Sequence, residues 1–252
     1  MPLTSVKLSA EVYLLFTTFA LCTEREECVA LLLGTFEEDT PGTVANVKNL
    51  LFPSERREKK RDRVEISDAD MTRAMSEADR AGLSVIGWCH SHPHITVLPS
   101  HVDLRTQLNH QAMDDRWFGI IVSCFSGKTG DIEAAQRIQI NCFQSRSTDS
   151  ANIRIEVPLY VTPSSGRPLE HDVITKLACV LPELFFNEEE TSFRTASASL
   201  TDKMSTSYNS NLYIQMLTNL IDKLCAPLLA TIQLRHQRNL REIETLQAQL
   251  KT

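Results

Sequence analysis

The stretch from residue 83 to residue 103 constrains the fold more than any other part of the sequence. It begins with a short apolar run, Leu83 to Trp88, that predicts a buried β-strand. His90 and His92 follow two residues apart, so at an extended strand end both side chains point to the same side. Asp103 lies just inside a helix that Ser100 is predicted to start. The sequence therefore predicts a polar site where this strand ends and this helix begins.

Two imidazoles and one carboxylate form a sufficient ligand set for a catalytic zinc ion. Such a site uses three protein ligands and leaves the fourth position to water. Zinc lowers the pKa of that water to about 7, which makes hydroxide available as a nucleophile at neutral pH. His90, His92 and Asp103 are accordingly the predicted metal ligands, with one zinc ion per chain.

Two further histidines and one other class of zinc enzyme are alternatives to this assignment. His94 is evenly spaced from His92 but lies beyond Pro93, where the chain must change direction, and His101 opens the predicted helix. A zinc deaminase also combines a histidine and a glutamate at its metal. It needs His-x-Glu and Pro-Cys-x-x-Cys motifs, and the sequence contains neither.

Composition excludes several other classes of protein. The net charge of −6 gives no electrostatic support to wholesale nucleic-acid binding, and the short basic stretch from Arg56 to Arg61 is expected to be a solvated loop. No apolar run approaches the roughly 18 residues of a membrane span. The run from Val12 to Cys22 is only moderately apolar and is expected to be an amphipathic helix rather than a signal peptide.

The cysteines indicate a reducing compartment. Their number, seven, is odd, and the sequence has no Cys-x-x-Cys pair. Both facts argue against a disulfide framework and against a structural zinc knuckle. Several of them lie inside apolar runs and are expected to behave as small buried hydrophobic residues.

Helix and strand patterns alternate through the first 162 residues and predict an α/β sandwich of mixed sheet flanked by helices. The predicted helices start at Ser9, Ser67 and Ser100 and end near residues 21, 81 and 113. The predicted strands cover residues 28–36, 44–51, 64–66, 83–90, 118–125, 132–143 and 152–161, with a hairpin turn at 127–130.

The composition changes after residues 163–166, and no further strand is convincing. Helices are predicted at residues 168–181, 182–194, 212–224 and 227–250, and the stretch 195–211, rich in Ser, Thr and Asn, is expected to be a linker or loop. Pro182 and Pro227 suit first-turn positions and are expected to mark breaks between helices. We therefore expect a catalytic domain at 1–162 and a helical extension at 163–252.

The last predicted helix carries a narrow apolar stripe. Its members recur at a spacing of about 3.5 residues, with interruptions at His236 and Asn239: Leu229, Ile232, Ile243, Leu246 and Leu250. The helix either packs back on its own domain or forms a coiled-coil seam to a partner chain. A terminal helix has little of its own chain left to bury such a stripe, which favours the partner.

The histidine motif resembles the signature of the JAMM (MPN+) metalloproteases, His-x-His-Pro-x6-Ser-x-x-Asp. The match has no gap and uses His90, His92, Pro93, Ser100 and Asp103. The family also has an upstream glutamate that opens a strand, in the pattern Glu-x-x-Gly-x-x-x-Gly. The segment from Glu27 to Gly34 is similar, with Ala30 in place of the first glycine.

The flanking residues resemble one branch of that family, the lysine-63-specific deubiquitinases of the BRISC and BRCA-associated complexes. The resemblance covers most of the chain, including the helical tail, and is carried by residues 65–67, 85–97, 100–103, 123–125 and 142–145. It implies the MPN fold and a zinc-dependent isopeptidase that cleaves lysine-63-linked ubiquitin chains. It also implies assembly through the helical tail with a catalytically inactive MPN-fold partner, and a location in cytoplasm and nucleus.

The resemblance also implies roles for two further residues. Glu27 is expected to act as the general base that takes a proton from the attacking water and gives it to the leaving amine. Ser100 is the expected hydrogen-bond donor to the tetrahedral oxyanion. It is also the predicted helix N-cap, and the two roles are compatible because capping uses its lone pairs and oxyanion binding uses its proton.

Two other functions compete with this interpretation. An MPN-fold scaffold with an idle pocket would need no metal, and the complete ligand set argues against it. The second competing function is a zinc amidohydrolase of the same fold that acts on small molecules. The coiled-coil stripe argues against it, because such a stripe indicates assembly with another protein. The loops at 53–63 and 94–102 are the expected substrate contacts.

Overall fold

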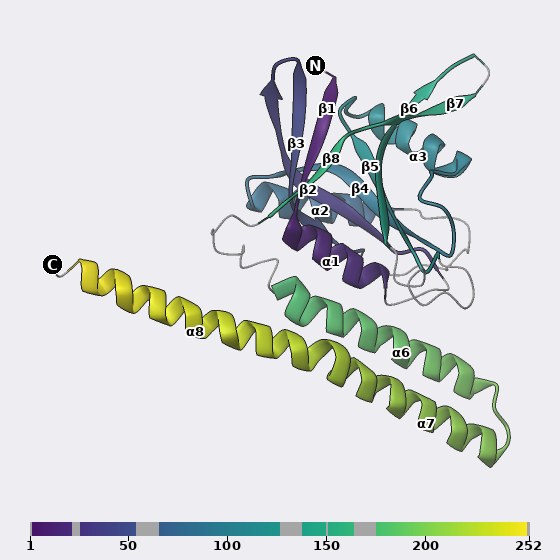
Figure 1. Ribbon diagram of the computed structural model, residues 1–252. Helices are drawn as coiled ribbons and strands as arrows, with labels where there is room; N and C mark the ends of the chain where they lie inside the picture. The colour runs from purple at the N-terminus through teal and green to yellow at the C-terminus, as the bar shows by residue number, and fades with distance from the viewer. Residues whose placement is uncertain are drawn as a thin grey trace. The chain divides into compact units, whose positions relative to one another are not determined.

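The computed structural model describes residues 2–21, 26–53, 66–126, 138–149, 151–163 and 175–250. Contacts within the chain divide it into two compact units, Met1–Leu169 and Glu170–Thr252 (Figure 1). Several predicted segments fall wholly or partly outside the described residues: the loop at 53–63, the strand at 64–66, the turn at 127–130, the first half of the strand at 132–143 and the first residues of the helix from 168.

The first unit is built on a mixed sheet, as the sequence predicts. The strands described run in the order β7-β6-β5-β4-β2-β3-β1-β8. Their bounds are β1 Leu3–Ser9, β2 Val29–Asp39, β3 Gly42–Leu51, β4 Ser84–Pro93, β5 Phe118–Cys124, β6 Gln139–Ser147, β7 Asn152–Glu156 and β8 Leu159–Thr162. The β1–β3, β1–β8 and β4–β5 pairs are parallel, and the others are antiparallel.

Among the described residues, three helices flank this sheet, and each begins at the serine that the sequence predicts. They are α1 (Ala10–Ala20), α2 (Asp68–Arg80) and α3 (His101–Gln111), and their N-caps are Ser9, Ser67 and Ser100. In each case the serine side chain accepts a backbone hydrogen bond from the third residue of the helix. These bonds satisfy N–H groups that have no partner inside the helix, which explains where each helix starts.

The helices cover both faces of the sheet. Leu31, Leu33 and Trp88 pack in one cluster with Ala74 of α2 and Leu104 of α3. The alternate strand positions face α1 and line a small apolar cavity with it: Leu32, Cys89, Ile120, Val122 and Ile140 on the strands, and Val12, Tyr13 and Phe16 on the helix. Because side chains alternate along a strand, a strand between these layers must be apolar at every position, as residues 29–33 are.

The predicted edge strand at residues 152–161 is wrong in one respect, because it is two strands. Val157 and Pro158 separate β7 from β8, and these two strands lie at opposite edges of the sheet. Pro158 has no N–H to donate, but its carbonyl accepts from Val6 at 2.9 Å, so the chain changes neighbours there. Only two residues join the two edges, so the sheet is curled. The strand β1 precedes the first predicted helix and was not expected.

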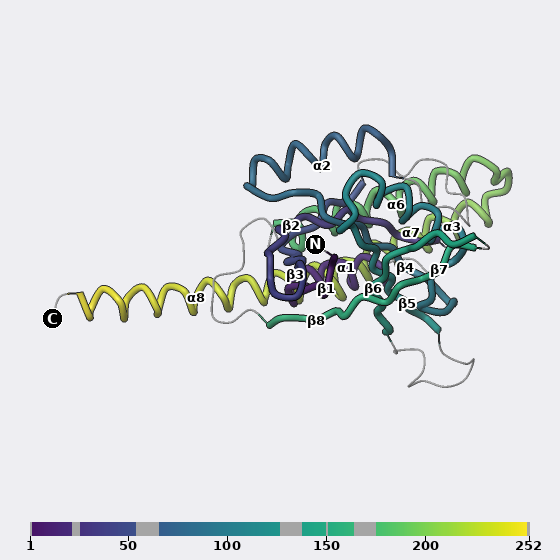
Figure 2. Tube along the Cα trace, turned by 90° about the horizontal axis from the view of Figure 1, so that it is seen from above, coloured from purple at the N-terminus to yellow at the C-terminus, as the bar shows by residue number. Residues whose placement is uncertain are grey.

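The second unit is helical. It consists of the π-helical turn η1 (Lys176–Val180), α6 (Leu181–Ala198), α7 (Lys203–Leu220), a second π-helical turn η2 (Ile221–Cys225) and α8 (Ala226–Gln249). Within this unit α7 contacts α6 and continues through η2 into α8 (Figures 1 and 2). Among the described residues, no helix is both long and apolar enough to cross a bilayer.

The loop predicted at residues 195–211 is wrong, because most of it belongs to α6 and α7. Asp202 caps α7 by accepting from the backbone of Ser205 at 2.8 Å. Thr206 donates its hydroxyl hydrogen to the carbonyl four residues earlier, as side chains do that are satisfied within a helix. Asn209 bonds Ser197 across the two helices at 2.9 Å. The polar residues therefore support a helical hairpin where composition suggested a linker.

The two prolines do not break the helices, contrary to expectation. Each follows a π-helical turn, and the preceding backbone stays helical, with φ −68° and ψ −44° at Val180 and φ −66° and ψ −47° at Cys225. A proline cannot donate the hydrogen bond that its helical position requires. The wider turn before Pro182 and Pro227 lets the chain continue in helical conformation without that bond.

Candidate metal centre

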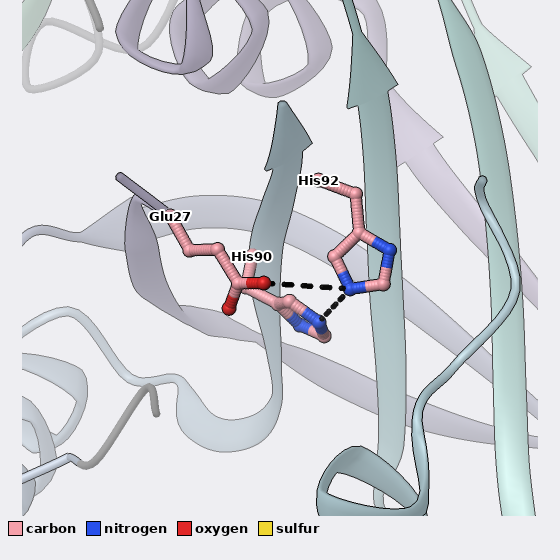
Figure 3. A group of neighbouring side chains, drawn as sticks. All are labelled: Glu27, His90 and His92. Atoms are coloured by element: carbon pink, nitrogen blue, oxygen red, sulfur yellow. Dashed lines mark hydrogen bonds and ion pairs between the residues drawn. The ribbon is translucent and has the colours of Figure 1, made fainter. Parts of the chain in front are cut away.

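Strand β4 brings the two histidines of the motif together. His90 and His92 occupy alternate positions, and β4 lies between β2 and β5, where both side chains are 2 % exposed or less. Their Nε2 atoms lie 3.0 Å apart. Figure 3 shows both rings turned toward the same point, with the carboxylate of Glu27 beside them. The spacing of two residues thus produces the convergence that the sequence predicts.

The first turn of α3 adds the carboxylate of Asp103 to this point. Its Oδ1 lies 3.4 Å from Nε2 of His90, and its Oδ2 lies 3.5 Å from Nε2 of His92. The same carboxylate accepts from the backbone N–H of Ser100 at 2.6 Å, while Asp103 N–H donates to Ser100 Oγ at 3.2 Å. This capping box and the helix dipole both hold the carboxylate at the helix N-terminus.

Glu27 reaches the site from the segment just before β2. Its Oε1 lies 3.9 Å from Nε2 of His92, and one donor atom from each of Glu27, His90 and His92 lies within 4.8 Å of the others. Ser91, between the two histidines, faces the other way. Its hydroxyl accepts from the N–H of Cys28 at 2.8 Å, and its N–H donates to the Cys28 carbonyl at 2.9 Å. Ser91 therefore fixes the chain that carries Glu27 against β4.

The arrangement fits a metal ion. Nδ1 of His92 lies 2.7 Å from the Thr96 carbonyl, which can only accept, so Nδ1 carries the hydrogen and Nε2 offers its lone pair. The two Nε2 atoms lie 3.0 Å apart beside the carboxylates of Asp103 and Glu27, so these side chains can offer their donor atoms to one metal ion. Tetrahedral zinc at 2.0–2.1 Å would separate two ligand atoms by about 3.3 Å, close to the observed spacings.

The charges within the site also favour a bound metal ion. Burial alone would raise the pKa of Asp103, but its contacts with the two imidazoles and with Ser100 hold that pKa well below its usual range. Burial would lower the pKa of His92, yet contacts with Asp103, the Thr96 carbonyl and Glu27 raise it above 6.5. Asp103 is thus an anion at any neutral pH, and its position favours a positive charge beside the imidazoles.

The structure brings four of the predicted site residues together and places the fifth, Ser100, next to them. The two alternative histidines do not join the cluster. His94 lies past the end of β4 with φ 61°, its ring 5.7 Å from that of Phe125, and His101 is an exposed residue in the first turn of α3. The roles of the clustered residues remain predictions.

Sequence reasoning missed three residues that support the site. Ser91 holds the Glu27 segment, Trp88 stacks on His90, and Gln107 accepts a hydrogen bond from the Trp88 indole. Ser91 could have been found from its place between two histidines, which directs its side chain to the opposite face of the strand. Gln107 is four residues after Asp103, on the same helix face, but nothing in the sequence identifies its partner.

Comparisons with known proteins agree with this geometry. The family model described as JAB1/Mov34/MPN/PAD-1 ubiquitin protease matches residues 2–116, and that of the BRCC36 C-terminal helical domain matches residues 174–252. The Lys-63-specific deubiquitinase BRCC36 of Xenopus tropicalis is 35 % identical, over 99 % of this chain and 95 % of that protein. The proteins of the same name from Camponotus floridanus and Rattus norvegicus are 34 % and 31 % identical, over 99 % and 96 % of this chain and 95 % and 92 % of theirs.

Proposed function

This chain belongs to the JAB1/Mov34/MPN/PAD-1 ubiquitin protease family, in its BRCC36 branch, and from that membership we propose a zinc-dependent deubiquitinase that hydrolyses lysine-63-linked ubiquitin chains. The observation that supports the mechanism best is the pair of imidazole nitrogens 3.0 Å apart, with the Asp103 carboxylate against both. The linkage preference is supported by the name shared by the relatives.

We assign His90, His92 and Asp103 to the zinc ion and Glu27 to proton transfer. Asp103 contacts both imidazoles at 3.4 and 3.5 Å, whereas Glu27 is farther from His92, at 3.9 Å. Bound zinc would supply the Lewis acidity that lowers the pKa of water to about 7 and makes it a nucleophile. Attack by water requires no covalent intermediate with the protein, so no cysteine nucleophile is needed.

The position of Glu27 supports its proposed role in proton transfer. Its side chain is 19 % exposed, so it borders both the metal ligands and the solvent from which substrate arrives. As general base it takes a proton from the attacking water, and as general acid it gives that proton to the leaving lysine amine. Proton transfer by one positioned group contributes about 10²–10⁴-fold to the rate.

The hydrogen bonding of Ser100 supports its proposed role in stabilising the oxyanion. Its Oγ accepts from the N–H of Asp103, so its lone pair serves the helix and its hydrogen is not used by that bond. The hydrogen can be donated to the substrate oxygen as negative charge develops on it. Loss of one such donor costs about 10²–10³-fold in kcat.

We also propose that the helical unit binds a catalytically inactive MPN-fold subunit, and that the protein works in cytoplasm and nucleus. The match of residues 174–252 to the BRCC36 C-terminal helical domain supports assembly through this unit. So does α8, on which no residue is buried and Leu229, Ile243 and Leu246 are each about half exposed.

The deciding experiment measures zinc content and cleavage of lysine-63-linked di-ubiquitin together, with and without the inactive partner. We expect one zinc per chain, and cleavage by wild type only when the inactive partner is present. Glu27→Gln keeps the size of the side chain and should retain zinc but lose about 10²–10⁴-fold in kcat. Glu26→Gln is the matched control, and it should cleave like wild type.

Two results would contradict the proposal in different ways. If Glu27→Gln cleaves as well as wild type while zinc is bound, another group is the general base. If wild type binds no zinc and cleaves nothing under any condition, the chain is a scaffold and the three ligand side chains are structural. Lysine-48-linked di-ubiquitin, tested in parallel, should be cleaved much more slowly if the linkage assignment is right.

A further inference from the structure

The two histidines of the site differ in what holds their rings. His92 donates its Nδ1 hydrogen to the Thr96 carbonyl. Nδ1 of His90 is buried and has no hydrogen-bond partner among the described residues. A metal-ligating histidine almost always has such a partner, because it fixes the tautomer and the plane of the ring. Some other contact must therefore orient His90.

That contact is the indole of Trp88. The two rings stack with their centroids 4.6 Å apart and their planes 13° from parallel. Trp88 precedes His90 by two residues on β4, so both side chains lie on the same face of the strand. The indole is only 1 % exposed, and its Nε1–H donates to Oε1 of Gln107 at 2.8 Å. The plane of His90 thus depends on a tryptophan that is itself fixed by one hydrogen bond.

Gln107 is held so that its oxygen must face the indole. It is completely buried, and its amide nitrogen donates to Oε1 of Gln111 at 3.0 Å and to the Trp117 carbonyl at 2.8 Å. These two bonds use both amide hydrogens, which leaves the carbonyl oxygen for Trp88. Gln107 lies one turn after Asp103 on the same face of α3.

We propose that Gln107 is a positioning residue for the metal centre. The proposal rests on the zinc function assigned to this site. Strand β4 supplies Trp88 and His90, and α3 supplies Gln107 and Asp103. One hydrogen bond joins Gln107 to Trp88, and Asp103 meets His90 one turn away. Gln107 therefore sets both the plane of His90 and the distance at which α3 presents its carboxylate to the imidazoles.

Gln107→Met tests this role. Methionine has nearly the same length but offers the indole no comparable acceptor, so Trp88 and His90 lose their fixed orientation. We expect the zinc affinity to fall about 10–100-fold, as it does when outer-shell partners of metal ligands are removed. The kcat for di-ubiquitin should fall while KM stays unchanged, because a completely buried side chain cannot touch the substrate.

Gln144→Met is the matched control. Gln144 lies on β6, and its amide nitrogen donates to the Trp117 carbonyl, as that of Gln107 does, and to the Asp115 carbonyl, at 2.8 and 2.9 Å. Within the described residues it bonds neither Trp88 nor Gln107. This variant also loses hydrogen bonds to backbone carbonyls and should be destabilised, but it should bind zinc as wild type does.

The measurements are the zinc dissociation constant by competition with a chelator, the absorption spectrum of the cobalt-substituted protein, and the unfolding midpoint. All use the full chain without substrate. The inference is supported if Gln107→Met alone weakens zinc and alters the cobalt spectrum. It is overturned if Gln107→Met binds zinc as wild type does, or if Gln144→Met weakens zinc equally, since the role is then only structural.

A second variant covers the case in which Gln107→Met does not fold. Trp88→Phe keeps an aromatic ring under His90 but removes the tethering N–H together with part of the indole, so it should also weaken zinc by at least about tenfold. Unchanged affinity in Trp88→Phe overturns the inference. A wild type that binds no zinc is a separate result, because it contradicts the function of the whole site rather than the role of Gln107.

Discussion

At the scale of single residues, Ser100 shows how one side chain can serve the helix and the reaction together. Its oxygen accepts from Asp103 N–H, and its backbone N–H donates to the Asp103 carboxylate. The cap thus fixes a predicted metal ligand as well as the helix. Substitutions that keep the cap and remove the hydroxyl hydrogen can separate the two roles.

Ser100→Gly and Ser100→Ala make this separation. Glycine at an N-cap costs only a few tenths of a kcal/mol relative to serine, whereas alanine costs about 1 kcal/mol. If Ser100 donates to the oxyanion, both variants should lose about 10²–10³-fold in kcat although only alanine destabilises the protein clearly. Ser100→Thr, which keeps the hydroxyl, is the control. Activity that follows the unfolding midpoint instead would show that Ser100 acts only as a cap.

The two histidines and the aspartate could be located from sequence because their spacing is local, whereas Glu27 was assigned from the family pattern alone. His90 and His92 point to the same side because side chains alternate along a strand. Asp103 lies in the first turn of a helix whose start is predicted from Ser100, a preferred N-cap residue. Trp88 and Gln107 could not be paired in advance. Their hydrogen bond depends on how α3 packs against β4, and that packing is a tertiary property that no local pattern contains.

At the scale of elements, Gly34 decides how β2 pairs with its neighbours. The register between β2 and β3 shifts between Leu33 and Gly34, so the backbone there approaches β3 closely. A Cβ added at Gly34 would clash with the Asn46 carbonyl and lie 2.6 Å from Cδ1 of Ile86. Ala30, at the other glycine position of the family pattern, is fully buried opposite Cys89.

Gly34→Ala should therefore destabilise the protein by about 3 kcal/mol or more, because a backbone carbonyl cannot move aside as a side chain can. Gly82→Ala is the comparison. Gly82 has φ +64° and open space around it, so alanine there costs only about 1–2 kcal/mol of backbone strain. Urea unfolding of both variants measures the difference. Equal losses of stability in the two variants would mean that β2 and β3 can move apart at the register shift to make room for the methyl group.

The boundaries of helices and strands could be predicted where a local sequence signal sets them. The prediction was wrong where contacts between distant segments set the boundary. The three serine caps gave the starts of α1, α2 and α3. The division of β7 from β8 depends on Pro158 bonding to β1, which is distant in sequence. Residues 195–211 were assigned to a loop by composition, but the contact of α6 with α7, including the stacked rings of Phe193 and Tyr213, makes them helical.

At the scale of the whole molecule, the two units expose their cysteines differently. Among the described residues, Cys28, Cys89, Cys124 and Cys142 are buried in the first unit, whereas Cys179 of the helical unit is exposed. Burial raises the pKa of Cys124 to about 11 and holds those of Cys89 and Cys142 well above the usual range. Only the thiolate reacts with alkylating reagents.

Iodoacetamide at pH 8 should therefore modify Cys179 rapidly and the four buried cysteines slowly, as peptide mapping by mass spectrometry would show. The same chemistry bears on function, because an enzyme that uses water as nucleophile has no activated cysteine. A ubiquitin derivative with an electrophile at its C-terminus should not label the chain. Rapid labelling by that probe would indicate a cysteine nucleophile and contradict the zinc mechanism.

The exposed apolar side chains of α8 are the expected contacts of the inactive partner. Ile243 and Leu246 are 49 % and 52 % exposed, so burying the remaining half of each side chain in a helical interface contributes about 0.8–1.5 kcal/mol each. Ile243→Glu should thus weaken binding of the inactive partner by about tenfold or more and reduce cleavage, while zinc content stays at one per chain. Glu244→Gln, on the adjacent exposed position, should change neither property.

Light scattering of the mixed subunits measures the association, and thermal unfolding of the chain alone measures its stability. The two open interpretations of the apolar stripe give opposite results. If α8 packs back on its own chain, Ile243→Glu lowers the unfolding midpoint of the isolated protein and leaves association intact. If α8 binds the partner, the isolated protein unfolds as wild type does, because a half-exposed isoleucine contributes little until the partner covers it.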